Sequence, residues 1–149
     1  MGTRALVIMR VKTRNGKYQI CCVMYQQFDG HIKGVGIKLI NFLHKIKLVR
    51  SLHTNDKDVA YGAGCLFSQI IVHFKTAAGK SYIIEPYETA QEEYNYYVDI
   101  DNEKLLVNIS IKNYEELIFS GTLEEAHEFV NNYSIKISNQ NNIDEKNHT

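Results

Sequence analysis

Residues 5–28, ALVIMRVKTRNGKYQICCVMYQQF, decide the fold of this 149-residue chain. Residues 5–12 and 17–28 are rich in β-branched and apolar side chains, which is typical of strands. Between them lies Asn15-Gly16, the strongest short signal of a β-hairpin, because a type I′ turn needs a positive φ at two successive residues. The chain therefore begins with two antiparallel strands.

Two helices are predicted after the hairpin. The apolar side chains of the first recur with the 3.6-residue period of an amphipathic helix. Residues 50–58 are polar and predict a loop, and residues 60–75 predict a second apolar helix. The periodic positions of the first helix are Val35, Leu39, Phe42, Leu43 and Ile46.

Three or four further strands and a third helix follow. Thr122 and Glu125 have the spacing of a capping box, which places a helix start there and a helix that ends near Asn132. This order of elements predicts a single-domain α+β fold with a mostly antiparallel sheet and about three helices. The expected strands are residues 81–84, 94–100, 105–111 and 116–119, with a tight connection at 101–103.

Length and composition fit one domain, residues 1–133, followed by a disordered polar tail, residues 134–149. No apolar run approaches the ~20 residues that span a bilayer, so no membrane is expected. The first residues lack the pattern of a secretory signal. Three cysteines without C-x-x-C spacing favour a reducing compartment, the cytoplasm.

The formal net charge of zero conceals two halves of opposite sign. Residues 1–84 contain 13 Lys and Arg against three Asp, whereas residues 85–149 contain four Lys against 14 Asp and Glu. Three explanations are open. The two halves neutralise each other within one chain, they associate with the opposite halves of another copy, or the basic half binds an anion. Complementary halves and ten tyrosines predict a homo-oligomer, specifically a two-fold dimer.

The sequence contains four short motifs: MGTR at 1–4, YQQFDG at 25–30, G-x-G at 34–36 and GAGCL at 62–66. Together they resemble a family of proteins from bacteria, phages and large viruses that has no established activity. The resemblance covers roughly residues 1–100. It implies kinship and an intracellular setting, the host cytoplasm for a viral protein. This chain has Gln26 where the family pattern has Arg, and His31-Ile32 where an aromatic residue and Pro are usual.

The turn between the second strand and the first helix is the candidate ligand site. Its glycines let a ligand approach, and a helix start offers free N–H groups to anions. The nearby cations attract a phosphate-bearing ligand, and a carboxylate accepts from a hydroxyl or amine. One alternative is a structural turn whose glycines meet backbone and packing demands. Another is a pairing of Asp29 with Arg4 that locks the end of the sheet to the first helix. The site residues are Arg4, Gln27, Asp29, Gly30, His31, Lys33, Gly34, Gly36 and Lys38.

These observations favour a non-enzymatic binding or regulatory accessory protein, of the kind phages and large viruses encode. Its partner would be a nucleotide, another small anion or a protein. The alternatives are a small hydrolase or transferase that uses Asp29 and a histidine, and a structural or assembly protein. No cofactor is predicted, no metal is expected without ligand spacing, and no nucleic-acid module is present.

Overall fold

The computed structural model describes residues 2–51, 58–86 and 91–147. In it the first two strands form the hairpin that the sequence predicts. Strands β1 (Ala5–Lys12) and β2 (Tyr18–Gln26) pair antiparallel. The predicted type I′ turn is wrong, because only Gly16 has a positive φ in it, 79°. The Gly16 N–H donates to the Thr13 carbonyl at 3.0 Å, which closes a loop longer than two residues. Such a loop needs a single left-handed residue.

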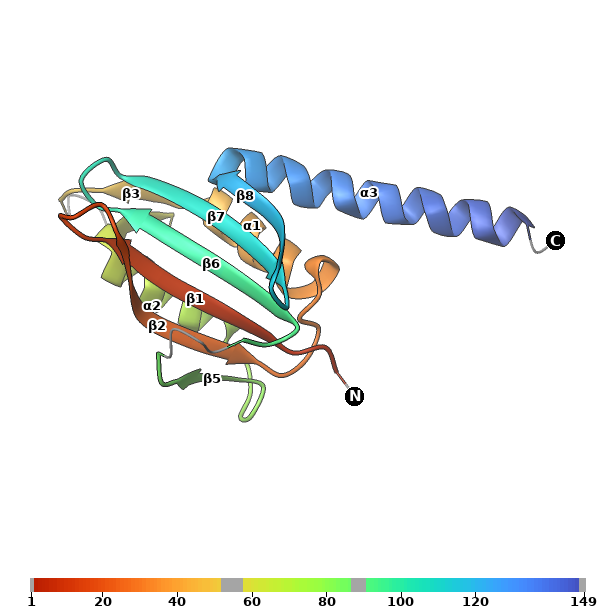
Figure 1. The fold of residues 1–149 in the computed structure, drawn as a ribbon, viewed down its shortest axis with the longest axis horizontal. Helices are drawn as coiled ribbons and strands as arrows, with labels where there is room; N and C mark the ends of the chain where they lie inside the picture. Colours follow the sequence, from red (N-terminus) through yellow and green to blue (C-terminus); the bar gives the residue numbers. More distant parts are fainter. Residues whose placement is uncertain (1, 52–57, 87–90, 148–149) are drawn as a thin grey trace.

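Six strands form one mixed sheet in the order β5-β2-β1-β6-β7-β8 (Figure 1). The later strands are β5 (Ser81–Ile84), β6 (Tyr94–Asp101), β7 (Leu106–Asn113) and β8 (Glu116–Thr122). Strands β1 and β6 pair parallel, and every other neighbouring pair in this sheet is antiparallel. The predicted α+β class with a mostly antiparallel sheet is therefore confirmed.

Helices cover one face of this sheet. In Figure 1, α1 (Ile37–His44) and α2 (Gly62–Phe74) lie behind the strands, and a π-helical turn, η1 (Ile32–Gly36), leads into α1. The loop predicted at residues 50–58 falls largely outside the described residues. On either side of it, β3 (Lys47–Val49) and β4 (Val59–Tyr61) form a small parallel pair that the sequence did not predict.

The core lies between the sheet and the helices. Alternate side chains of the central strands point into it, as the two-residue period of a strand requires. A smaller cluster lies on the opposite face and contains Leu6, Ile8, Val23 and Tyr25. The main core includes Val7, Met9, Tyr96, Val98 and Ile109 from the sheet, with Leu39, Leu43, Leu66 and Ile70 from α1 and α2.

The two oppositely charged halves of the chain are joined by ion pairs. Arg10 binds Asp99 through two hydrogen bonds of 2.6 and 2.7 Å. Lys12 also pairs with Asp101, and a hydrogen bond joins His44 to Glu124, so these contacts too connect a residue before 85 to one after it. Part of the charge asymmetry is thus neutralised within one chain. The two-fold dimer stays a prediction.

The third helix, α3 (Leu123–Asn147), is longer than predicted. Its expected end near Asn132 is wrong, because the sequence from there to Asn147 contains neither Gly nor Pro, the residues that stop helices most strongly. Beyond its first turns α3 extends past the sheet (Figure 1). None of the described helices, α3 included, is both long and apolar enough to cross a membrane. The division of the chain at residue 134 stays a prediction.

The predicted capping box at the start of α3 is present. Thr122 Oγ1 accepts from the Glu125 N–H at 3.2 Å, and Glu125 Oε1 accepts from the Thr122 N–H at 3.1 Å. The Thr122 N–H and the Thr122 hydroxyl both donate to the Glu125 carboxylate, and these bonds hold the pKa of Glu125 below its usual value. Both residues thereby satisfy N–H groups that would have no partner within the helix.

We expect Thr122→Ala to lower the free energy of unfolding by about 1 kcal/mol, because it removes the side-chain cap of α3. Urea denaturation monitored by circular dichroism measures the loss. Thr122→Ser retains the hydroxyl and serves as the control, with nearly wild-type stability. Equal stability of the alanine and serine variants would contradict the capping role.

Candidate functional site

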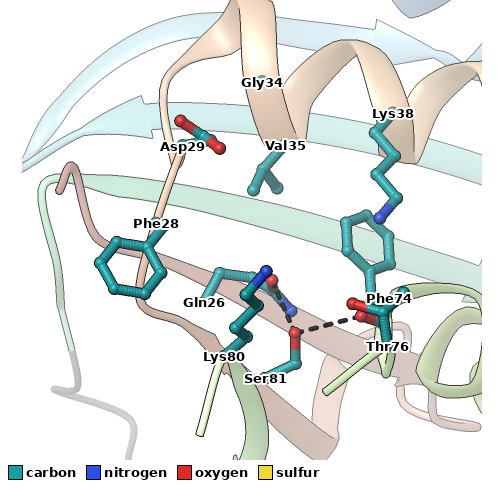
Figure 2. A pocket seen from close by; sticks show the side chains of 10 residues that line it. All are labelled: Gln26, Phe28, Asp29, Gly34, Val35, Lys38, Phe74, Thr76, Lys80 and Ser81. Carbon is teal, nitrogen blue, oxygen red and sulfur yellow. Dashed lines mark hydrogen bonds between the residues drawn. The ribbon is translucent and has the colours of Figure 1, made fainter. Parts of the chain in front are cut away.

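A cavity of about 490 Å³ opens where β2 ends (Figure 2). Its walls come from three places: the turn after β2, the helical segment formed by η1 and α1, and the chain between the end of α2 and the start of β5. We call it the Gln26 cavity. It is lined by Gln26, Phe28, Asp29, Gly34, Val35, Lys38, Phe74, Thr76, Lys80 and Ser81.

A buried polar pair forms the floor of the Gln26 cavity. Gln26 and Ser81 are only 6% and 2% exposed. They lie opposite each other because β2 and β5 pair in that register. The Ser81 hydroxyl lies 2.8 Å from Gln26 Oε1 and 3.3 Å from the Phe74 carbonyl oxygen (Figure 2). The pair therefore ties the end of α2 to the sheet beneath the cavity.

One half of the Gln26 amide has no partner. Its Nε2 is buried and donates no hydrogen bond to any described residue. The Ser81 hydroxyl has one proton, but two acceptors, Gln26 Oε1 and the Phe74 carbonyl, lie within reach. If the Gln26 amide is rotated by half a turn, Nε2 donates to the Ser81 oxygen and the Ser81 hydroxyl donates to the Phe74 carbonyl. That orientation presents the amide oxygen at the unpartnered position. Either way, one polar atom of the Gln26 amide is buried beneath the cavity without a partner among the described residues, and leaving such an atom unpaired costs free energy.

Two lysines stand at the rim of the cavity. The Lys38 ammonium lies 4.7 Å from the centre of the Phe74 ring, within the range of a cation–π contact (Figure 2). Lys80 approaches from the other side. Among the described residues, no carboxylate forms a salt bridge with either lysine. Burial lowers the pKa of His73, and the charges of Lys38 and Lys45 lower it further.

Asp29 supplies the carboxylate of the cavity. It has a left-handed backbone, with φ 58°, and its carbonyl accepts from the Val35 N–H at 2.8 Å. Its carboxylate makes no hydrogen bond or ion pair within the part of the chain that the structure describes. The proposed pairing of Asp29 with Arg4 is therefore not formed. The carboxylate is exposed at the rim, where it can accept hydrogen bonds.

The predicted anion site at the helix start has a different structure. The Gly34 N–H donates to His31 Nδ1 at 3.1 Å, so the His31 side chain caps η1. The N–H groups of Val35 and Gly36 are also bonded, to the carbonyls of Asp29 and His31. These donors are not free to bind an anion. Charge at this site comes from lysine side chains instead.

Two of the predicted glycines serve packing. A Cβ on Gly30 would lie 2.8 Å from the Arg4 backbone, and one on Gly36 would lie 3.2 Å from the Tyr96 ring. The buried Tyr96 hydroxyl donates to the Gly30 carbonyl at 2.7 Å. Burial raises the pKa of Tyr96 far above its usual value, which keeps this donor protonated. Gly30 and Gly36 let the helical turn approach the sheet closely, and neither lines the Gln26 cavity.

The remaining predicted site residues do not all lie in one cavity. Asp29, Gly34 and Lys38 line the Gln26 cavity, and Lys33 is exposed outside it. Arg4 and Gln27 line a neighbouring cavity, which we call the Arg4 cavity. Phe28 belongs to both linings. The Arg4 cavity is lined by Gly2, Thr3, Arg4, Gln27, Phe28, Glu92, Glu93 and Tyr114.

Sequence reasoning missed the floor of the site. Ser81 comes from a segment in which the sequence singled out no binding residue, and the pairing of β5 with β2 brings it opposite Gln26. Phe74, at the end of α2, and Lys80, at the rim, were likewise not predicted as binding residues. Gln26 was noted for its departure from a family pattern and not as a binding residue. Phe28 lies inside the motif at 25–30 and is 47% exposed, which a sequence does not reveal.

The enzymatic alternative needs a histidine beside Asp29. Asp29 lines the Gln26 cavity, but none of the residues that line it is a histidine. His31 is occupied as a cap, and the His73 ring stacks on Phe42 at 4.1 Å. Within the described ranges, no three His, Cys, Asp or Glu side chains form a group that could hold a metal.

Two features define the Gln26 cavity: a buried, half-satisfied amide at the floor and two rim lysines that form no salt bridge with a described carboxylate. The chain matches no protein-family model, no curated protein and no solved structure.

Proposed function

We propose that this protein is a non-enzymatic binding protein that holds a small phosphate-bearing ligand in the Gln26 cavity. The observation that carries this proposal is the pair of rim lysines, Lys38 and Lys80, which form no salt bridge with a described carboxylate and stand above the half-satisfied Gln26 amide. An anionic oxygen held between the two ammonium groups would accept hydrogen bonds from both. Hydrogen bonds between charged groups are shorter and stronger than neutral ones.

The shape and polarity of the cavity support a small ligand. Its volume of about 490 Å³ lies within the range of small-molecule sites. Val35 and Phe74 supply apolar wall, and Thr76 and Ser81 contribute hydroxyl groups. The Asp29 carboxylate favours a ligand that carries hydroxyl groups as well as an anion, since a carboxylate only accepts hydrogen bonds. A sugar phosphate has both features.

We expect ribose 5-phosphate to bind and ribose to bind at least tenfold more weakly, because most of the attraction comes from Lys38 and Lys80. Removing one lysine charge, in Lys38→Gln or Lys80→Gln, should weaken binding of ribose 5-phosphate about tenfold, the usual value of a charged hydrogen bond. NMR titration of the backbone amides measures the dissociation constants and locates the shifted signals.

Lys17→Gln is the matched control for both variants. Lys17 is also exposed, but it lies in the β1–β2 turn, at the opposite end of β2 from Gln26. This variant removes the same charge and should bind ribose 5-phosphate like the wild type. An equal loss of affinity in all three variants would show a non-specific charge effect. No binding by the wild type at millimolar ribose 5-phosphate would overturn the proposed function.

A further inference from the structure

Phe28 separates two cavities of opposite charge. The side chain is 47% exposed and belongs to the lining of both the Gln26 cavity and the Arg4 cavity. On the first side stand Lys38 and Lys80, and on the other stand Glu92 and Glu93. A large aromatic ring left half exposed between two polar cavities is a surface on which a flat apolar ring can stack.

The Phe28 ring is held in place from one side. A Cβ on Gly2 would lie 2.5 Å from Phe28 Cδ1, so the ring rests against the backbone of Gly2. The backbone beneath it is also fixed. The Gln27 N–H donates to the Lys80 carbonyl at 3.0 Å, and the Gly30 N–H donates to the Thr3 carbonyl at 2.9 Å. Phe28 therefore presents a positioned aromatic surface, and a ligand that stacks on it need not order the loop.

The charges of the Arg4 cavity differ from those of the Gln26 cavity. Glu92 and Glu93 contribute two carboxylates against the single guanidinium of Arg4, and none of the three forms a salt bridge with a described residue. The Glu92 N–H donates to Asn95 Oδ1 at 3.0 Å, which fixes the backbone at this position. This side of Phe28 thus offers acceptors, whereas the Lys38 side offers donors.

We propose that the ligand is a nucleotide, with its phosphate in the Gln26 cavity and its base stacked on Phe28 toward Glu92 and Glu93. This inference rests on the proposed function and names the ligand class of the same site. A nucleotide combines an anion, hydroxyl groups and a planar ring whose exocyclic amine donates to a carboxylate. A sugar phosphate alone satisfies the lysines and leaves the Phe28 surface and the acidic side unused.

The test compares AMP with ribose 5-phosphate, which differ by the base. We expect the wild type to bind AMP about tenfold more tightly, the effect of one base stacked on an aromatic side chain. Phe28→Leu keeps an apolar side chain but removes the aromatic surface, so the advantage of AMP should disappear. Phe28→Tyr keeps an aromatic ring and should retain the tighter binding of AMP. NMR titration measures the four dissociation constants that decide the comparison, those of AMP and of ribose 5-phosphate for the wild type and for Phe28→Leu.

Tyr61→Leu is the control for losing an exposed aromatic ring. Tyr61 is 48% exposed, like Phe28, but it ends β4 and lines neither cavity. This variant should keep the wild-type preference for AMP. If ribose 5-phosphate and AMP bind equally and Lys38→Gln weakens both, the nucleotide inference fails while the proposed function stands. If neither ligand binds the wild type, both fail.

Discussion

Replacing Gly34 with alanine is expected to lower the free energy of unfolding by about 3 kcal/mol, at the upper end of the usual cost of overpacking. A Cβ on Gly34 would lie 2.0 Å from the Asp29 carbonyl oxygen, which is backbone and cannot rotate away. That carbonyl also accepts from the Val35 N–H, so relief of the clash breaks a hydrogen bond of η1. Chemical denaturation of the variant measures the loss.

Gly64→Ala is the matched control and should change stability in the opposite direction. Gly64 lies in α2, and a Cβ there would meet nothing within 4 Å. Alanine at this position should stabilise the protein by up to about 1 kcal/mol, since Gly is a poor helix former. Wild-type stability of Gly34→Ala would contradict the close approach of η1 to Asp29.

Asp99→Ala should likewise destabilise the protein by about 3 kcal/mol, because it leaves a partly buried guanidinium without its carboxylate. Asp99 is 5% exposed and accepts two hydrogen bonds from Arg10. The Arg10 guanidinium also lies 4.5 Å from the centre of the Tyr97 ring and 5.6 Å from that of Tyr18. Since two rings and a carboxylate fix this group, it cannot easily turn to water. Urea denaturation at neutral pH measures the loss.

Lys12→Ala provides the comparison for Asp99→Ala. Lys12 pairs with Asp101 on the same two strands, but at 3.6 Å and with a more exposed side chain. The decrease in the free energy of unfolding caused by Lys12→Ala should be small and should vanish in high salt, as for other exposed ion pairs. The double variant Arg10→Ala/Asp99→Ala should be more stable than Asp99→Ala alone, because it removes the unpaired charge. A double variant that loses the sum of the single effects would contradict this coupling.

The fold was predictable wherever a few adjacent residues determine the local structure. Asn15-Gly16 located the first hairpin, and Thr122 with Glu125 located the start of α3, because turns and caps depend on residues close in sequence. The parallel pairing of β1 with β6 was not predictable, since nothing near either strand specifies a partner so distant in the chain. The β3–β4 pair escaped notice for a related reason: its strands of three residues are too short to show a period.

The candidate site was predicted in its location but not in its composition. Asp29, Gly34 and Lys38 belong to a turn that the sequence singled out, and they do line one cavity. The expected N–H donors are paired instead, because the His31 ring and two carbonyls satisfy them. The floor required knowing that Gln26 faces Ser81, which lies 55 residues later in the chain. Such a contact is set by tertiary structure and leaves no local pattern.

The position of β1 between β2 and β6 has a consequence for synthesis on the ribosome. Its hairpin partner β2 emerges directly after it, but its other neighbour is far away: Arg10 precedes Asp99 by 89 residues. At the usual rate of elongation, β1 has one unpaired edge for on the order of ten seconds. That edge runs along the apolar residues Ala5 to Met9, and unpaired apolar edges recruit strands of other chains. Aggregation of nascent chains therefore competes with folding at a strand that the finished protein places in the middle of its sheet.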